Sequence, residues 1–343
     1  MDTDARSHIV TSKTDIRFTW DYDRAHQPLS RLYEKAKKAQ WNAEDLPWDT
    51  DVDQEALARS EAALMGGFAP GAHLAGTPFE HWGDAEWLRL AVEGQNWMMS
   101  QFLHGEQGAL ICTSKLVETA PSIEAKYYAA TQVFDEARHV EVFSRYLDEK
   151  LCGHYPVNEH LRALLDDIVT DERWDVTYLG MQVLVEGLAL AAFGAIRQLA
   201  ADPLLQELLR KVMIDEARHV AFGVISLSDV YAGLSAAELR ERQEFAYEAV
   251  LRMRDRFAMQ EVWDRLGVPV EAGIALVQQT PEQAMFQKLL FARIVPNCRK
   301  LGLLDAGDGW LRQRFTELGI IAFEHCTDGE EEAHLDDLAG VRL

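Results

Sequence analysis

The residues with the clearest chemical potential belong to two identical hexapeptides. The sequence DEARHV at positions 135–140 recurs at positions 215–220. Each copy contains Glu-x-x-His, and residues three apart lie on one face of a helix. The carboxylate and the imidazole of each copy can therefore bind one metal ion together. The two pairs are Glu136 with His139 and Glu216 with His219.

The repeat extends to a single glutamate before each hexapeptide. Glu106 lies thirty residues before Glu136, and Glu186 lies thirty residues before Glu216, each among apolar neighbours. A carboxylate on the core face of a helix is costly unless it is paired or binds metal. Four glutamates and two histidines from four helices form the ligand set of ferritin-like di-iron and di-manganese bundles. Carboxylate and imidazole ligands suit iron or manganese better than metals that prefer thiolates.

The repeat has two other possible interpretations, a solvated helix face and an ion-pair network. A single Glu-x-x-His is usually a solvated helix face, and Arg138 and Arg218 could make the repeat an ion-pair network between two helices. Against these, Asp135 and Asp215 precede the paired glutamates, where a carboxylate that orients a ligating imidazole is expected. An ion-pair role also does not predict the two single glutamates at matching offsets. We therefore predict a dinuclear metal site and expect three nearby glutamates to be solvated: Glu93, Glu118 and Glu172.

Apolar residues at three- and four-residue intervals predict long helices, and alternating strand patterns are nearly absent. Asp202 and Pro203 provide an N-cap and a first helical residue. We expect one all-α domain, a ferritin-like four-helix bundle core at 82–267 with N-terminal arm and helices at 1–81 and a C-terminal helical extension at 268–343. The expected helical segments are 29–41, 52–65, 83–117, 121–150, 171–200, 202–232 and 236–265, with two more helices around Gly302 within 281–324.

Composition limits the classes of partner. The 343 residues include 48% hydrophobic and 26% charged residues, which is typical of a folded chain, and the net charge is −22. Such an acidic surface repels nucleic acids and anionic membranes. The four cysteines are far apart without metal-site spacing, so we expect them to be reduced. We expect neither a signal peptide nor a membrane span, and hence a cytoplasmic protein.

The residues of the extended repeat resemble the ligand pattern of the ferritin-like non-haem di-iron oxygenases over roughly residues 82–232. That superfamily includes hydroxylase α-subunits of bacterial multicomponent monooxygenases, ribonucleotide reductase small subunits and p-aminobenzoate N-oxygenases. The resemblance implies two iron ions, or a Mn/Fe pair, with O2 as co-substrate. It also implies that the metal ligands are the catalytic residues: Glu106, Glu136, His139, Glu186, Glu216 and His219.

Departures from the family patterns narrow the expected activity. Phe143 stands where radical-generating reductase subunits have a tyrosine, and Val212 stands where the N-oxygenases have an additional histidine. The chain is also shorter than the multicomponent α-subunits. We therefore expect a stand-alone oxygenase that hydroxylates or N-oxygenates a small organic substrate. Electrons would come from a separate reductase or ferredoxin, and the chain would form a homodimer. Alternatives are a ferroxidase or other iron-handling protein, a Mn/Fe ligand-binding oxidase, and a non-catalytic binding protein.

Residues near the predicted ligands supply candidates for the substrate site. Arg293 and Arg299 are candidate anchors for a substrate carboxylate. Trp41 and Trp48 are expected to belong to an arm packed on the bundle or on a partner subunit. The expected lining consists of apolar side chains one turn from the ligands: Phe102, Leu110, Phe143, Val183, Leu190 and Phe193. Four polar residues on the ligand helices are expected to form surface or local hydrogen bonds: Gln101, His104, Thr113 and Gln132.

Overall fold

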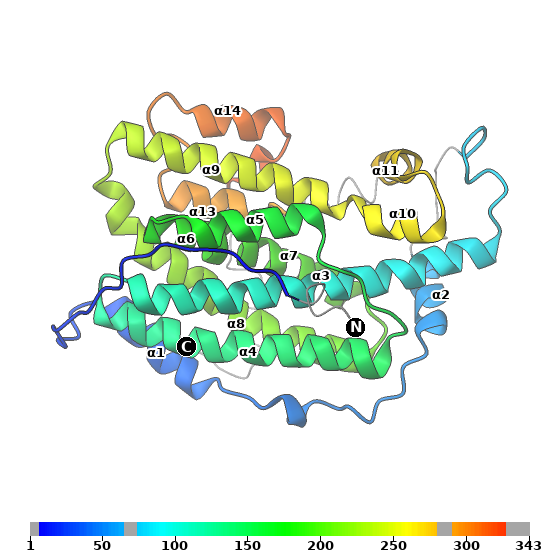
Figure 1. Ribbon diagram of the computed structural model, residues 1–343, viewed down its shortest axis with the longest axis horizontal. Helices are drawn as coiled ribbons and strands as arrows, with labels where there is room; N and C mark the ends of the chain where they lie inside the picture. The colour runs from blue at the N-terminus through cyan, green and yellow to red at the C-terminus, as the bar shows by residue number, and fades with distance from the viewer. Residues whose placement is uncertain (1–6, 65–73, 280–289, 327–343) are drawn as a thin grey trace.

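The structure, a computed structural model, describes residues 7–64, 74–279 and 290–326 (Figure 1). Every regular element in those ranges is a helix, so the expected all-α class is confirmed. The main elements are α1 (Gln27–Lys38), α2 (Gln54–Leu64), α3 (Asp84–Thr119), α4 (Ile123–Lys150), α5 (Glu159–Thr170), α6 (Trp174–Tyr178), η3 (Leu179–Val185), α7 (Glu186–Leu199), α8 (Pro203–Ala232), α9 (Ala236–Asp255), η4 (Arg256–Ala258), α10 (Gln260–Leu266), α11 (Val270–Gln279), α13 (Ile294–Lys300) and α14 (Trp310–Glu317).

Two helical hairpins form the four-helix core. Helix α3 packs along α4, and α7 packs along α8. The loops between the paired helices, at 120–122 and 200–202, are short, which favours antiparallel neighbours. Contacts of α4 with α8 and of α3 with η3 join the hairpins. The internal repeat of the sequence is therefore a repeat of one hairpin.

Side-chain caps fix where the second helix of each hairpin begins. The Ser122 hydroxyl accepts a hydrogen bond from the backbone N–H of Ala125 at the start of α4. Asp202 accepts one from the backbone N–H of Leu204 at the start of α8, where Pro203 is the first helical residue. Each cap satisfies an amide that lacks an intrahelical partner and contributes about 0.5–2 kcal/mol. The caps therefore set the positions of the metal-binding pairs along the helices.

A π-helical segment precedes the ligand on α7. Element η3 continues α6 without a break and ends immediately before Glu186. Apolar spacing does not distinguish this wider turn from an α-helix, so the sequence predicted only one helix over 171–200. Helix α8 approaches the segment closely at Gly223, where an added Cβ would lie 2.7 Å from the Cβ of Gln182. The absence of a side chain at Gly223 permits this contact.

The most apolar helical stretch lies within the bundle. Trp174–Gln198 is long and apolar enough to cross a membrane, which the sequence analysis did not anticipate, but 72% of its most apolar window is buried inside the protein. It also carries the buried Glu186. These features are those of the core helix of a soluble protein.

The expected single helix over 236–265 is wrong. Helix α9 ends at Asp255, the short turn η4 follows, and Met259 adopts a left-handed conformation with φ of 54° before α10 begins. Trp263 is fully buried and donates a hydrogen bond of 2.9 Å to the carbonyl of Ala258. It packs against Phe79 in a second, smaller apolar cluster. Burial of this indole favours the bend over a straight helix.

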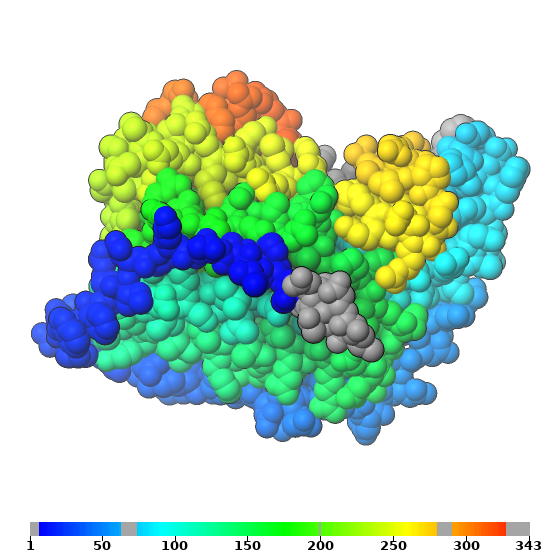
Figure 2. Space-filling view, viewed as in Figure 1, coloured from blue at the N-terminus to red at the C-terminus, as the bar shows by residue number. Residues whose placement is uncertain are grey.

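The outer elements agree in part with the sequence. Helices α1 and α2 lie within the predicted segments 29–41 and 52–65 or extend them slightly, and α13 and α14 flank Gly302 as predicted. Met65 and residues 281–289 lie outside the described residues. Helices α5 and α11 were not predicted. The arm before α1 crosses the face formed by α3 and α5 (Figures 1 and 2).

The four cysteines are free, as expected. Cys112 and Cys298 are buried, whereas Cys152 and Cys326 are exposed and are not packing residues of the core.

We predict that Gly223→Ala lowers the free energy of unfolding by about 1–3 kcal/mol, because the new methyl group forces α8 away from η3. Gly94→Ala is the matched control on α3. A Cβ added at Gly94 would lie 3.8 Å from the Met259 sulfur, an ordinary contact, and alanine there stabilises the helix by about 0.5–1 kcal/mol. Urea unfolding followed by circular dichroism measures both. Equal stabilities for the two variants would contradict the close contact.

Candidate metal centre

Six acidic and imidazole side chains meet in the centre of the bundle. They are all buried, and their ligand atoms form two groups, in each of which all atoms lie within 4.8 Å of one another. The structure thus brings together every ligand named by the sequence analysis. The first hairpin contributes Glu106 from α3 with Glu136 and His139 from α4, and the second contributes Glu186 from α7 with Glu216 and His219 from α8.

The first group contains Glu106, Glu136, His139 and Glu216. The Nδ1 atom of His139 lies 3.1 Å from a Glu106 oxygen, 3.2 Å from a Glu216 oxygen and 3.5 Å from a Glu136 oxygen. Ligands from both hairpins therefore surround one point.

The second group contains Glu136, Glu186 and His219. The Nδ1 atom of His219 lies 3.1 Å from a Glu136 oxygen and 3.6 Å from a Glu216 oxygen. Because Glu136 belongs to both groups and Glu216 approaches both histidines, these two carboxylates are placed to bridge two ions.

Unsatisfied polar atoms support a fit to metal. Glu136, Glu186 and Glu216 each have one buried oxygen without a hydrogen-bond partner in the described structure. Such groups cost about 1–3 kcal/mol each when left unpaired. Two divalent ions would neutralise the four glutamates and use these atoms as ligands. The donor set therefore fits a dinuclear iron or manganese centre.

The electrostatics of the cluster without metal point the same way. Burial and the nearby Glu216 carboxylate raise the pKa of Glu106 to about 8, and burial together with Glu136 raises the pKa of Glu186 well above its usual value. Burial alone would lower the pKa of His139, but hydrogen bonds to Asp215 and Glu106 raise it instead. Protons thus offset part of the negative charge. Metal binding must displace them, so metal affinity rises with pH.

Two aspartates orient the histidines from behind. The Nε2 atom of His139 lies 3.2 Å from Asp215, and Nε2 of His219 lies 3.4 Å from Asp135. The aspartate of each hexapeptide therefore contacts the histidine of the other. This arrangement turns Nδ1 of each ring toward the glutamates, as expected for a ligating imidazole supported by a carboxylate.

The two repeat arginines neutralise these aspartates. One Nη atom of Arg138 lies 2.7 Å from Asp135 and 2.8 Å from Asp215. Arg218 pairs with the same two aspartates. The ion-pair network considered for the repeat is therefore present, and it lies beside the six-residue cluster rather than replacing it.

The end of the first helical segment covers this network. Trp41 donates a hydrogen bond of 2.8 Å to Asp215, and its ring lies under the Arg138 guanidinium at 4.4 Å. Gln40 donates to Asp135 at 3.1 Å. The sequence indicated only that Trp41 belongs to a segment packed on the bundle or on a partner subunit. Its contact with Asp215 spans 174 positions, so only the tertiary structure reveals it.

Gln132 was expected to form surface or local hydrogen bonds, but it contacts two of the predicted metal ligands. Its amide donates to Glu136 at 2.9 Å and to Glu186 at 2.8 Å. The spacing of one helical turn before Glu136 was the available sequence signal. The other three polar candidates make hydrogen bonds elsewhere: Gln101 with Pro156 and Asn158, His104 with Tyr155, and Thr113 with Gln182.

The three glutamates expected to be solvated differ from one another. Glu118 and Glu172 are exposed. Glu93 is partly buried and accepts a hydrogen bond of 2.8 Å from the Tyr155 hydroxyl, so its carboxylate is not simply solvated.

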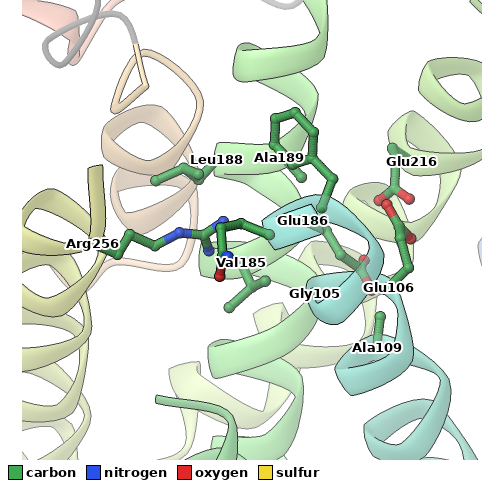
Figure 3. Close-up of a pocket in the computed structure, with 11 residues that line it drawn as sticks. Gly105, Glu106, Ala109, Val185, Glu186, Leu188, Ala189, Glu216 and Arg256 are labelled. Atoms are coloured by element: carbon green, nitrogen blue, oxygen red, sulfur yellow. The ribbon is translucent and has the colours of Figure 1, made fainter. Parts of the chain in front are cut away.

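A cavity of about 20 Å³ adjoins the cluster (Figure 3). Glu106, Glu186 and Glu216 form one end of the cavity. Arg256, which directly follows α9, lies at the other end. Apolar side chains line the space between. Sequence analysis did not single out Arg256, because an arginine in a helical pattern is usually solvated. The remaining lining residues are Gln101, Phe102, Gly105, Ala109, Val185, Leu188 and Ala189.

Of the six residues expected to line a substrate pocket, Phe102 lines this cavity. Phe143 and Phe193 pack against Phe102, with ring centroids 6.0 and 4.7 Å away, and belong to the core. Leu110, Val183 and Leu190 lie outside the lining. The two candidate anchors, Arg293 and Arg299, also lie outside it, and Arg299 is paired with Glu324.

Solved structures share this architecture, although no family model matches the sequence. An R2-like ligand-binding oxidase with an aerobically reconstituted Mn/Fe cofactor aligns over 81% of this chain and 93% of its own, with 17% identity and a TM-score of 0.55. The fold is ferritin-like. A variant of an R2-like ligand-binding oxidase with an anaerobically reconstituted Mn/Fe cofactor gives 18% identity, coverage of 81% and 94%, and a TM-score of 0.56. The expected ferritin-like fold is thus confirmed.

We predict that Asp215→Asn weakens metal affinity about 10–100-fold, because the amide no longer provides the charge that orients His139. Trp41→Phe is the matched control, since it removes one hydrogen bond to Asp215 and leaves the carboxylate in place. Competition with a chromogenic chelator measures both affinities. An unchanged affinity in Asp215→Asn would contradict the assigned role.

Proposed function

We propose that this protein is an O2-using oxidoreductase with a dinuclear iron or Mn/Fe centre. The observation that carries the proposal is the position of the ligand cluster. Glu106, Glu186 and Glu216 face a partly apolar cavity, so one side of the centre is open to small molecules. A purely structural metal site would be closed by protein ligands on every side.

The residues of the chain would hold and orient the centre. The six side chains of the two groups would hold two ions, with Glu136 common to both groups. Gln132 restrains two of the carboxylates through its amide, and Asp135 and Asp215 restrain the histidines. Bound metals would supply the electron transfer that activates O2. Phe102 and Leu188 in the cavity wall would exclude water from the reaction.

The reaction class follows from the open cavity and the superfamily fold. We propose hydroxylation, or N-oxygenation of an amine, on a small organic substrate. In such a monooxygenation, one atom of O2 enters the substrate. The other leaves as water, formed with two protons and two electrons. A separate reductase or ferredoxin would provide these electrons in the cytoplasm.

The alternative is a Mn/Fe ligand-binding oxidase, which the structural neighbours favour. Both compared structures carry Mn/Fe cofactors. The six ligands of this chain suit either metal pair, so the metals must be identified by analysis. The doubled Glu-x-x-His set and the adjoining cavity favour either oxidase over an iron-storage role.

We predict about two metal ions per chain in the purified protein and nearly none in Glu136→Ala, because Glu136 belongs to both ligand groups. Elemental analysis for iron and manganese, before and after anaerobic ferrous reconstitution, measures this. The control is Glu118→Ala on the exposed face of α3, which should retain both ions and metal-dependent O2 consumption. Full metal content in Glu136→Ala, or none in the reconstituted wild type, would exclude the proposed centre.

We also propose a homodimer. The N-terminal arm exposes several large apolar side chains, including Phe18 at 72% and Trp20 at 74%, whose rings stack at 5.4 Å. Exposed apolar groups concentrated on one segment are typical of a surface covered by another chain. Light scattering is expected to give twice the chain mass, and a smaller value for Phe18→Ser/Trp20→Ser. A wild-type monomer at micromolar concentration would contradict this.

A further inference from the structure

Arg256 is a buried cation for which the described part of the chain provides no counter-ion. Its side chain is 3% exposed and lines the cavity. Within the described parts of the chain, its guanidinium forms no ion pair with a carboxylate, and its Nε atom is buried without a hydrogen-bond partner. The Cζ atom of Arg256 lies 4.9 Å from the centre of the Phe257 ring. Charged side chains are almost never fully buried unless they are paired.

Other buried arginines of this protein show the ordinary arrangement. Arg242 is also buried and makes two hydrogen bonds, of 2.9 and 3.1 Å, to the Asp175 carboxylate. Arg138 contacts two aspartates in the repeat network. Arg256 differs because burial lowers its pKa to about 10 with no carboxylate near enough to offset the effect. Arg256, which lines the cavity, therefore differs from Arg242 and Arg138 in having no carboxylate partner among the described residues.

The cavity relates this cation to the metal ligands. Arg256 lies at one end, the metal-binding glutamates lie at the other, and Val185, Leu188 and Ala189 lie between them (Figure 3). A planar guanidinium binds a carboxylate through two parallel hydrogen bonds. An apolar body beyond that carboxylate would contact the aliphatic wall. A ligand bound this way has its far end directed toward the ligand cluster.

We propose that Arg256 binds the carboxylate of a small organic acid and thereby directs the apolar end of that acid toward the metal centre. That the acid is a substrate rests on the proposed function, whereas its binding does not. The present cavity of about 20 Å³ holds a group of water size, so the acid must widen it. Moving the Leu188 side chain, which lines the cavity, would enlarge the cavity without breaking a hydrogen bond.

Calorimetry and thermal unfolding of the full-length protein under anaerobic conditions test this binding without turnover. Hexanoate, hexanamide and hexylamine serve as probes with the same chain and different end groups. We expect hexanoate alone to bind and to raise the unfolding temperature. Arg256→Met should weaken hexanoate binding at least about tenfold, the equivalent of one charged hydrogen bond. Without ligand, it should unfold at a higher temperature than the wild type, because an unpaired buried charge has been removed.

Matched variants separate charge, geometry and fold. Arg256→Lys keeps the charge but not the two-pronged geometry, and its affinity should lie between those of the wild type and Arg256→Met. Arg254→Met changes an exposed arginine two residues away and should bind hexanoate like the wild type. Equal binding of hexanoate and hexanamide, or undiminished hexanoate binding in both Arg256 variants, would overturn the proposal.

Glu136→Ala distinguishes this inference from the proposed function. It should lose metal and still bind hexanoate, because Arg256 does not depend on the ligands. Loss of hexanoate binding in Glu136→Ala, with retention in Arg256→Met, would place the carboxylate on the metal and overturn the role of Arg256. Absence of metal from the wild type, with Arg256-dependent hexanoate binding, would refute the proposed function alone.

Discussion

The burial of four glutamates in an apolar bundle is the constraint on which the rest of the structure depends. Ionised carboxylates in such an environment are strongly disfavoured unless cations or hydrogen-bond donors offset their charge. The Gln132 amide donates to both Glu136 and Glu186, and two imidazoles lie near Glu136, yet one oxygen of each carboxylate has no hydrogen-bond partner in the described structure. The cluster is therefore completed by something other than protein, and metal ions suit its chemistry.

Charge is arranged in two shells around this centre. The inner shell contains the glutamates and the Nδ1 atoms of two histidines. In the outer shell, Asp135 and Asp215 are neutralised by Arg138 and Arg218 and contact the opposite imidazole edges. Because the aspartates already have arginine partners, the inner glutamates are left to bind metal. The same hexapeptide thus supplies the ligands and their support.

In the cavity, unlike in the aspartate–arginine network, a buried charge has no protein partner in the described structure. Inside it, negative groups and Arg256 lie at opposite ends, and the cation has no protein partner in the described structure. A folded protein can retain an unfavourable buried charge at a functional site, where a bound ligand would offset that charge. With opposite charges at its two ends, the cavity would orient a bound ligand. Under the proposed function, this polarity would select which end of a substrate lies near the metal centre.

The sequence by itself determined the core helices and the candidate ligand set. Helical periodicity marks each core helix, and the doubled hexapeptide with its preceding glutamates names all six residues that meet in the structure. These features are local or repeated at fixed offsets, so spacing alone reveals them. The bend at Met259 was not visible in this way, because it depends on burying Trp263 in a separate cluster.

Tertiary structure alone decided what surrounds the ligands. Trp41 reaches Asp215 across 174 positions, and Arg256 enters the cavity from α9, forty residues after Glu216. No periodicity links such positions, and most arginines and tryptophans at helix ends serve as surface or packing residues. The long-range packing of α1 and α9 on the two hairpins turns these side chains inward. A sequence can therefore specify a metal site through its repeat, while the fold specifies which molecules reach it.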